Sequence, residues 1–367
     1  MKNKFLNLRA MLLLAVLLCG GTAVFADTTV WRGDINYYLY DDLTAKVYGA
    51  NKDITTANIP DKITYGGKDY TVTCIGRGAF DECSRLSSVD IPNSVTSIYG
   101  DAFSYCSRLS SVVIPSSVTY IGEYAFENCR SLAYVDIPNS VTYIGKYAFR
   151  VCRLSSVTIP NSVTTINEGT FNGCRSLVSV DIPSSVRYIN GWAFEGCSSL
   201  SSVVIPSSVS YIGEQAFSGC YLASVVIPSS VTSIRDYTFG GCGSLSSVVI
   251  PSSVTSIGYH AFKDCSLTKL VCNATTPPAC DNEVFEGVDL DRCTLIVPQE
   301  SLDAYKSAAQ WKSFFNITTG IKNVPNTSSS ATESARYSTD GTRLASPQKG
   351  INIIRMSDGT VKKVLVK

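Results

Sequence analysis

Apolar positions recur along this chain in blocks of 22 or 23 residues. An Ile-Pro pair marks each block, and the steps between successive prolines are 23, 23, 22, 23, 23, 22 and 23 residues. The prolines are Pro92, Pro115, Pro138, Pro160, Pro183, Pro206, Pro228 and Pro251. A fixed period of this length predicts a stack of small units, each of which buries its faces only against its neighbours.

Residues 109–131 illustrate the predicted structure of one block. The spacing of Leu109, Val112 and Ile114 predicts a short inward-facing strand, which Pro115 ends because proline cannot donate to a strand ladder. A Ser-Ser bend follows, and Val118 and Ile121 then return to the core. The next column holds only Gly or Asn in most blocks, which predicts a left-handed turn there. Its members are Gly76, Gly122, Gly145, Asn167, Asn190, Gly213 and Gly258.

Nine cysteines share one column, each three residues after a phenylalanine. They are Cys83, Cys106, Cys129, Cys152, Cys174, Cys197, Cys220, Cys242 and Cys265. A cysteine that recurs once per block is most simply a small buried hydrophobe, because stacked side chains have poor disulfide geometry. We therefore predict free thiols in this column. Outside it, a disulfide between Cys272 and Cys293, or between Cys280 and Cys293, stays open as an alternative.

The repeated motif LxxVxIPxSVxxIGxxAFxxC covers residues 72–270 without a gap. It resembles the BspA-like leucine-rich repeats found on surface proteins of anaerobic bacteria. The resemblance implies an α/β-type repeat solenoid: right-handed and curved, with 22–23-residue turns and short parallel strands on the concave face. We expect the solenoid to span residues 71–270. A β cap of residues 27–70 would precede it, and a mixed cap of residues 271–317 with a helix over 301–315 would follow.

The two ends of the chain predict export. Residues 1–26 combine a positive start, an apolar run too short to span a bilayer and small residues before Asp27, which is typical of a signal peptide cut after Ala26. No other stretch is long and apolar enough for a membrane span. A polar linker of residues 318–335 leads to a short β tail, residues 336–367, which resembles the end of type IX secretion sorting domains. We expect a secreted protein or one on the outer cell surface.

Composition and motifs argue against several functions. The net charge is +1 and only 17% of residues are charged, which disfavours nucleic-acid binding. No catalytic motif is found, and the single histidine, His260, falls in a predicted surface column, where we expect it to be solvated. The column of Asp90, Asp136 and Asp181 has its members two turns apart, too far for a metal cage. We predict no enzyme, no cofactor and no metal site.

Two sets of outward-facing side chains are candidates for binding. Val204, Val226 and Val249 form an apolar stripe on the predicted strands, although small β-branched residues also simply suit a flat sheet. The aromatic set occupies two columns that flank the Gly/Asn turn, and we expect both on or near one lateral edge. These candidate ligand-binding residues are Tyr120, Tyr143, Tyr188 and Tyr211, and Tyr124, Tyr147, Trp192 and Tyr237. Rings of this kind anchor ligands, but stacking between neighbouring turns is the alternative interpretation.

The hypothesis that these observations favour is a secreted or surface-attached, adhesin-like binding protein. The resemblance implies a partner that is an extracellular protein or cell-surface ligand, such as a host matrix protein or another bacterium. A structural spacer of the cell envelope is the alternative, and an enzyme with an unrecognised site is a third.

Overall fold

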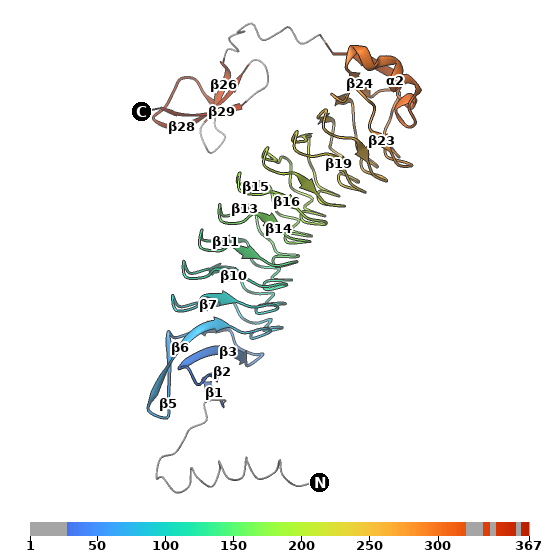
Figure 1. Cartoon of the computed structure of the whole chain (residues 1–367). Coiled ribbons are helices and arrows are strands. Elements are labelled where there is room, and N and C mark those ends of the chain that lie inside the picture. The colour runs from blue at the N-terminus through green and yellow to red at the C-terminus, as the bar shows by residue number, and fades with distance from the viewer. Residues whose placement is uncertain (1–27, 321–332, 338–342, 357–360, 367) are drawn as a thin grey trace, which may run out of the picture. The chain divides into compact units, whose positions relative to one another are not determined.

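The computed structural model describes residues 28–320, 333–337, 343–356 and 361–366 (Figure 1). The chain divides into two compact units, one that ends at Gly320 and one that begins at Ile321. The expected signal peptide, residues 1–26, lies outside the described residues, as does most of the expected linker.

Strands alone make up the start of the first unit. They are β1 (Thr28–Arg32), β2 (Ile35–Leu39), β3 (Thr44–Ala50), β4 (Thr56–Asn58), β5 (Lys62–Tyr65) and β6 (Lys68–Ile75). β1, β2 and β3 pair antiparallel, β3 pairs parallel with β6, and β5 forms a hairpin with β6. Tyr37 and Tyr70 are buried beneath them, so the alternating aromatic pattern of this segment forms a β cap over the first turn of the solenoid.

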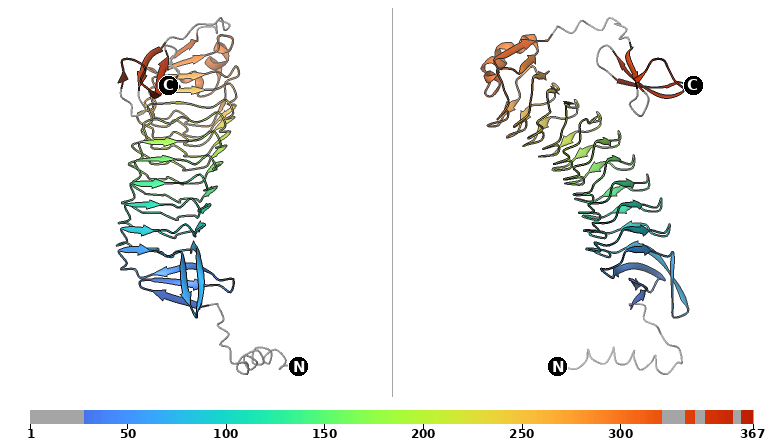
Figure 2. Two further views of the ribbon diagram at one scale, coloured as in Figure 1. Left: turned by 90° about the vertical axis from the view of Figure 1, so that its left-hand side faces the viewer. Right: turned by 180° about the vertical axis from the view of Figure 1, so that it is seen from behind.

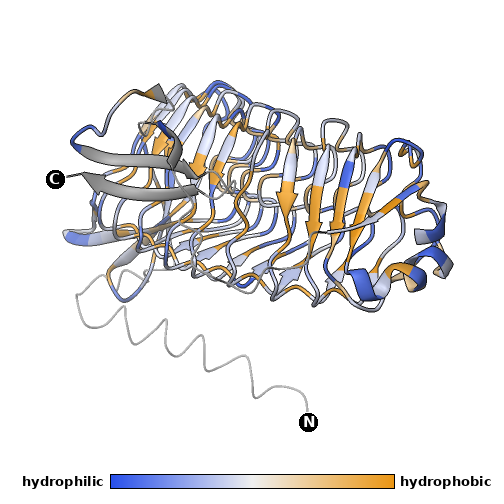
Figure 3. Cartoon of the chain, turned by 90° about the horizontal axis from the view of Figure 1, so that it is seen from above, coloured by the Kyte–Doolittle hydropathy of each residue, from blue (hydrophilic) through white to orange (hydrophobic). Residues whose placement is uncertain are grey.

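Most turns of the solenoid contribute one strand to a first strand row. Its members are β4, β7 (Ser88–Asp90), β9 (Ser111–Val113), β11 (Tyr134–Asp136), β13 (Ser156–Thr158), β15 (Ser179–Asp181), β18 (Ser224–Val226), β20 (Ser247–Ile250), β22 (Lys269–Cys272), β24 (Thr294–Val297) and β25 (Asn316–Thr319). The strands that pair within the row are parallel and join equivalent positions, such as Ser111 with Tyr134. In β9 and β11 the middle valine is buried between two exposed neighbours. Figure 3 shows hydrophobic and hydrophilic colours together on the strands of the stacked turns. The predicted solenoid of parallel-strand turns is confirmed.

A second strand row is formed by the segment of each turn that follows the Ser-Ser bend and was predicted to return to the core. It continues from β6 through β8 (Ser97–Ile98), β10 (Tyr120–Ile121), β12 (Tyr143–Ile144), β14 (Thr165–Ile166), β16 (Tyr188–Ile189), β17 (Tyr211–Ile212), β19 (Ser233–Ile234), β21 (Ser256–Ile257) and β23 (Ala279–Cys280). In the repeats the isoleucine is buried and the residue before it faces outward. Figure 2 shows the two rows running along different sides of the stacked turns.

The third side of each turn is built without helix. Its backbone alternates between right- and left-handed residues: Tyr124 and Asn128 have φ of 58° and 55°. The N–H groups of Tyr124, Phe126 and Asn128 donate to carbonyl oxygens of the next turn at 2.8–2.9 Å. This ladder satisfies backbone groups that a helix would otherwise pair internally.

The predicted left-handed turn at the Gly/Asn column is wrong. Gly122 is not among the residues of positive φ; the left-handed position lies two residues later, at Tyr124. Glycine stands at 122 for another reason: a Cβ there would lie 2.4 Å from the backbone nitrogen of Gly100. Glycine at 122 therefore allows successive turns to approach closely.

A ladder of phenylalanine rings fills the core. Phe80, Phe103, Phe126, Phe149, Phe171, Phe194, Phe217, Phe239, Phe262 and Phe285 stack in sequence, with ring centroids 5.1–5.8 Å apart and interplanar angles of 1–10°. Beside it, each cysteine thiol from Cys106 to Cys265 donates to the carbonyl oxygen of the phenylalanine one turn earlier, as Cys129 does to Phe103 at 3.2 Å.

Every cysteine in the described part of the chain is a free thiol. This confirms the prediction for the cysteine column. It also answers the open alternative: neither Cys272 nor Cys280 is bonded to Cys293. Cys272 lies instead 3.1 Å from the Tyr305 hydroxyl, in the interior of the C-terminal cap.

The C-terminal cap contains less helix than predicted. Instead of one helix over 301–315, it has η1 (Gln299–Ser301), α2 (Leu302–Ser307) and η2 (Trp311–Ser313). α2 ends because Ala308 is extended, and Gln310 then adopts a φ of 63°. The break turns Trp311 onto Phe285, the last ring of the phenylalanine ladder, at 5.7 Å. The Trp311 indole N–H donates to the Pro278 carbonyl oxygen at 2.8 Å, so the cap closes the open end of the core.

The second unit contains a sheet of four antiparallel strands. They are β26 (Glu333–Tyr337), β27 (Arg343–Leu344), β28 (Gly350–Met356) and β29 (Val361–Val366), in the order β27-β26-β28-β29. None of the helices in the described residues has the length and apolarity needed to cross a membrane.

Candidate functional site

The predicted aromatic residues occupy two positions of each turn. Tyr120, Tyr143, Tyr188 and Tyr211 begin the strands of the second row. Tyr124, Tyr147, Trp192 and Tyr237 occupy the left-handed position three residues after the isoleucine, with φ of 52–58°. We call this second set of positions the left-handed column.

Three residues of the left-handed column surround one hollow. The rings of Tyr124 and Tyr147 stack at 5.3 Å with an interplanar angle of 9°. The next turn has Gly169 in this column, and a Cβ there would meet the Tyr147 ring. The missing side chain leaves a gap before Trp192, and a hollow of about 460 Å³ opens. This aromatic hollow is lined by Tyr124, Tyr147, Arg150, Glu168, Asn172, Trp192 and Glu195.

Most polar groups of the aromatic hollow already have partners. Glu168 accepts hydrogen bonds from Lys146 at 2.9 Å and from Tyr147 at 3.1 Å. The Lys146 hydrogen bond lowers the pKa of Glu168, whereas burial and the Glu168 carboxylate raise the pKa of Tyr147 to about 12. Arg150 pairs with Glu127 at 2.5 Å. The walls are therefore held in place by contacts within the protein.

Trp192 differs from the other residues of the hollow. Among the described residues, none accepts a hydrogen bond from its indole N–H, and no ring packs on it. Its left-handed backbone is also costly, since a residue with a Cβ pays roughly 1–2 kcal/mol there and glycine does not. The half-buried indole thus has an unused donor and an open face within the described residues.

The remaining predicted residues lie in separate groups. Tyr120 and Tyr143 stack as a pair at 5.1 Å and 4°, while Tyr188 and Tyr211 tilt against each other at 6.5 Å and 53°. Thr165 stands between the two pairs in the same position. Stacking between turns, the alternative interpretation, therefore accounts for Tyr120–Tyr143 and Tyr124–Tyr147.

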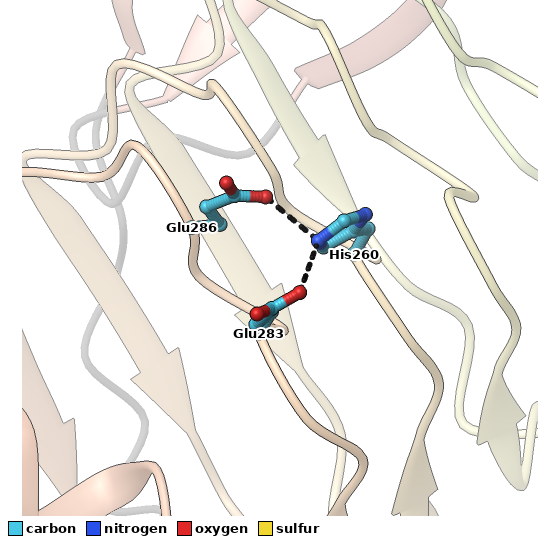
Figure 4. Close-up of side chains that lie close together, drawn as sticks. All are labelled: His260, Glu283 and Glu286. Atoms are coloured by element: carbon cyan, nitrogen blue, oxygen red, sulfur yellow. Dashed lines mark hydrogen bonds and ion pairs between the residues drawn. The ribbon is translucent and has the colours of Figure 1, made fainter.

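The expectation that His260 is a solvated surface residue is wrong. His260 is only 4% exposed and continues the left-handed column after Tyr237. Its Nδ1 lies 2.6 Å from the Tyr237 hydroxyl, and its Nε2 lies 3.0 Å from Glu283 and 2.7 Å from Glu286 (Figure 4). Because the column repeats every 22 or 23 residues, the period itself could have placed Tyr237, His260 and Glu283 together.

Arginines gather next to the aromatic hollow, a feature that the sequence analysis missed. A second hollow, here called the arginine hollow, is lined by Arg130, Arg150, Val151, Cys152, Arg153, Asn172, Gly173, Arg175 and Ser176. Arg130, Arg153 and Arg175 each follow a cysteine of the core column, so the repeat alignment contained the signal. Within the described residues, Arg153 and Arg175 have no ion-pair partner. The two hollows share Arg150 and Asn172.

The predicted valine stripe also lines a hollow. Val204 is 81% and Val226 64% exposed, and both line an open depression of about 550 Å³ with Val249. Val204 lies in no strand, so the first strand row has no member between β15 and β18 and is interrupted there.

Comparisons with known proteins agree with this architecture. Residues 50–178 and 164–291 match the family described as BspA type leucine rich repeat region, in six copies. The crystal structure of a leucine rich cell surface protein from Faecalibacterium prausnitzii is 26% identical, with a TM-score of 0.53 over 81% of this chain and 96% of that one. A leucine-rich repeat protein from Bacteroides ovatus is 24% identical, with a TM-score of 0.48 over 80% of this chain and 100% of that one. No curated protein matches the chain.

Proposed function

The chain belongs to the family of BspA type leucine-rich repeat proteins, and from this premise we propose that it is a secreted or surface-attached protein that binds another extracellular protein, as an adhesin does. The observation that carries the proposal is the aromatic hollow with its unpartnered Trp192. Tryptophan, tyrosine and arginine are the residues that most often dominate the free energy of protein–protein binding.

The chemistry of the partner follows from the two adjoining hollows. The aromatic hollow offers ring faces and one indole N–H, while the arginine hollow offers the guanidinium groups of Arg153 and Arg175, which form no ion pair within the described part of the chain. Guanidinium groups bind carboxylates through two parallel hydrogen bonds. The proposed partner is a protein surface with an apolar anchor beside acidic side chains, such as one on a host matrix protein or another bacterium.

The proposed location rests on the two chain ends. A signal peptide cleaved after Ala26 would deliver the chain across the inner membrane, and the β tail would direct type IX export. N-terminal sequencing of the exported protein would begin at Asp27 if the cleavage proposal holds, and protease treatment of intact cells would digest a surface-attached chain.

Binding of the purified chain to a panel of immobilised extracellular matrix proteins tests the function. We expect Trp192→Ala to weaken binding at least tenfold, about 1.4 kcal/mol, because it removes the anchor of the aromatic hollow. Arg153→Glu with Arg175→Glu should slow association and reduce the salt dependence of binding. Tyr134→Ala, an exposed tyrosine on the first strand row, is the matched control and should bind like the wild type.

Equal binding by the Trp192 variant and the control would remove the aromatic hollow from the proposal.

A structural spacer of the cell envelope is the second candidate, favoured by the uninterrupted phenylalanine ladder, which makes the unit one continuous stack. Light scattering distinguishes the two: self-association of the purified chain without any bound matrix protein supports the spacer.

A further inference from the structure

We propose that His260, Glu283 and Glu286 form a binding site for a divalent transition-metal ion, Zn²⁺ in the first place. The three side chains come from two adjacent turns, and their ligand atoms all lie within 4.8 Å of one another. His260 Nε2 faces Glu283 Oε2 at 3.0 Å and Glu286 Oε2 at 2.7 Å (Figure 4). The proposal is independent of the binding function above.

The first argument concerns the imidazole of His260. When Nδ1–H donates to the Tyr237 hydroxyl, 2.6 Å away, Nε2 presents a lone pair to two carboxylate oxygens. In this tautomer the Nε2 lone pair and the two carboxylate oxygens converge on one point, which suits a cation bound among them. A proton on Nε2 can point at only one of the two oxygens, whereas a metal ion takes all three atoms as ligands.

The second argument is that each proposed ligand has its own supporting partner. Tyr237 holds His260 Nδ1, the Tyr259 hydroxyl donates to Glu283 Oε2 at 3.0 Å, and the Lys263 ammonium donates to Glu286 Oε2 at 2.5 Å. Metal ligands in proteins are usually oriented by such outer hydrogen bonds, above all the second nitrogen of a histidine. Lys263 also neutralises one of the two carboxylate charges and would lie beside the ion as an outer partner.

The third argument is the combination of a fixed and an adaptable part. The His260 ring is buried and packs on Tyr259 and Tyr237, with centroids 3.6 and 4.9 Å away. The glutamate side chains are 57% and 45% exposed, so they can adjust. Two ligands at about 2.1 Å from Zn²⁺ lie ~3.4 Å apart at the tetrahedral angle, so the two distances from His260 Nε2 need to change by only tenths of an ångström. The two carboxylate oxygens lie within 4.8 Å of each other, and rotation of the exposed glutamate side chains can bring them together.

The ligand set selects the kind of ion. One imidazole nitrogen and two carboxylate oxygens suit Zn²⁺ and related transition ions, whereas Ca²⁺ and Mg²⁺ prefer ligand sets made of oxygen alone. Three protein ligands leave at least one coordination position, on the side where the two glutamates are exposed to solvent.

The chain contains a matched arrangement without histidine. At Glu168, a tyrosine and a lysine donate to one carboxylate, as Tyr259 and Lys263 do to the two glutamates. The next residue, Gly169, stands in the left-handed column, which holds Glu283 in the proposed metal site. Glu168 therefore serves as an internal control with a similar charge and similar partners.

Calorimetric titration of Zn²⁺ into the purified full chain, produced without a polyhistidine tag, tests the site. We expect one Zn²⁺ per chain, no comparable binding of Ca²⁺ or Mg²⁺, and a thermal midpoint that rises with Zn²⁺ concentration. Glu286→Gln and Glu283→Gln, both at exposed side chains, should each weaken binding at least tenfold. Glu168→Gln should bind like the wild type.

Cobalt distinguishes this site from the free thiols. Co²⁺ bound by His260 and the glutamates gives no thiolate-to-metal charge-transfer band, whereas Co²⁺ on cysteine does. His260→Ala should abolish binding, with circular dichroism to verify its fold. The proposal is overturned if Zn²⁺ does not bind the wild type, if Glu286→Gln binds equally well, or if the cobalt spectrum shows a thiolate band.

Discussion

At the scale of single residues, two positions of the repeat favour glycine for different reasons, although neither holds glycine in every turn. In the Gly/Asn column it permits the backbones of successive turns to approach, as at Gly122 and Gly145, where a Cβ would lie 2.4 Å from a nitrogen of the preceding turn. In the left-handed column glycine would adopt the positive φ at the lowest free-energy cost, yet tyrosine, tryptophan or histidine occupies this column in several turns. Asn167 is accommodated in the Gly/Asn column with its amide donating to the Ile144 carbonyl oxygen at 2.7 Å.

Gly122→Ala tests the close approach. The added methyl group must push two backbones apart, so we expect a loss of about 1–3 kcal/mol in unfolding free energy, as for other overpacked sites. Guanidinium unfolding monitored by circular dichroism measures it. Gly243→Ala is the control, because a Cβ there meets nothing within 4 Å and the residue lacks a positive φ. Equal stability of the two variants would contradict the packing explanation.

At the scale of elements, the strands are too short to be stable alone. β10 and β12 contribute two residues each, and their order comes from pairing with the turns on either side. The ends of the stack therefore need elements that differ from a repeat: β1 to β6 at one end, and α2 with η2 at the other.

Trp311→Ala should open the C-terminal end of the stack. It removes a fully buried ring from Phe285 and a hydrogen bond to Pro278, at a cost of about 3–5 kcal/mol. Because each turn contacts only its neighbours, amide hydrogen exchange should accelerate first in β22, β24 and β25. Trp311→Phe keeps most of the ring and should show a smaller effect. Uniform acceleration along the whole solenoid would contradict local fraying.

At the scale of the whole molecule, the cysteine column couples stability to pH. Burial raises the pKa of the Cys174 and Cys242 thiols from the ordinary value of 9.0 to about 12, and raises those of the other thiols of the column as well. The unfolded chain therefore loses thiol protons at lower pH than the folded chain does. The contribution of the buried thiols to the free energy of unfolding is therefore fully present below about pH 9. It is lost as the pH rises from about 9 toward 12.

Thermal unfolding at pH 8, 9 and 10 checks this dependence. Each buried thiol contributes a slope of at most about 1.4 kcal/mol per pH unit above pH 9. Cys174→Ala should show a shallower decrease than the wild type, and comparing slopes removes the effect of the small cavity. Identical slopes of stability against pH for the variant and the wild type would mean that the Cys174 thiol ionises equally in the folded and unfolded states. Below pH 9, the thiols of the folded chain should resist alkylation that the unfolded chain undergoes.

The sequence by itself determined the repeat, the strand positions, the inward set of side chains and the free thiols of the cysteine column. These follow from periodicity, because a side chain that recurs once per turn must stack on its copy in the next turn. It also identified the aromatic residues, but not which of them share a hollow.

Only the tertiary structure decided how neighbouring turns fit. The distance between backbones, rather than a left-handed turn, explains the Gly/Asn column. The absent side chain of Gly169 opens the aromatic hollow between rings that otherwise stack. The burial of His260 against two glutamates depends on contacts between turns, each set by the particular residues that meet there. A column predicts which residues are neighbours; side-chain size and rotamer, fixed by packing in three dimensions, decide whether those neighbours stack, leave a gap or form a site.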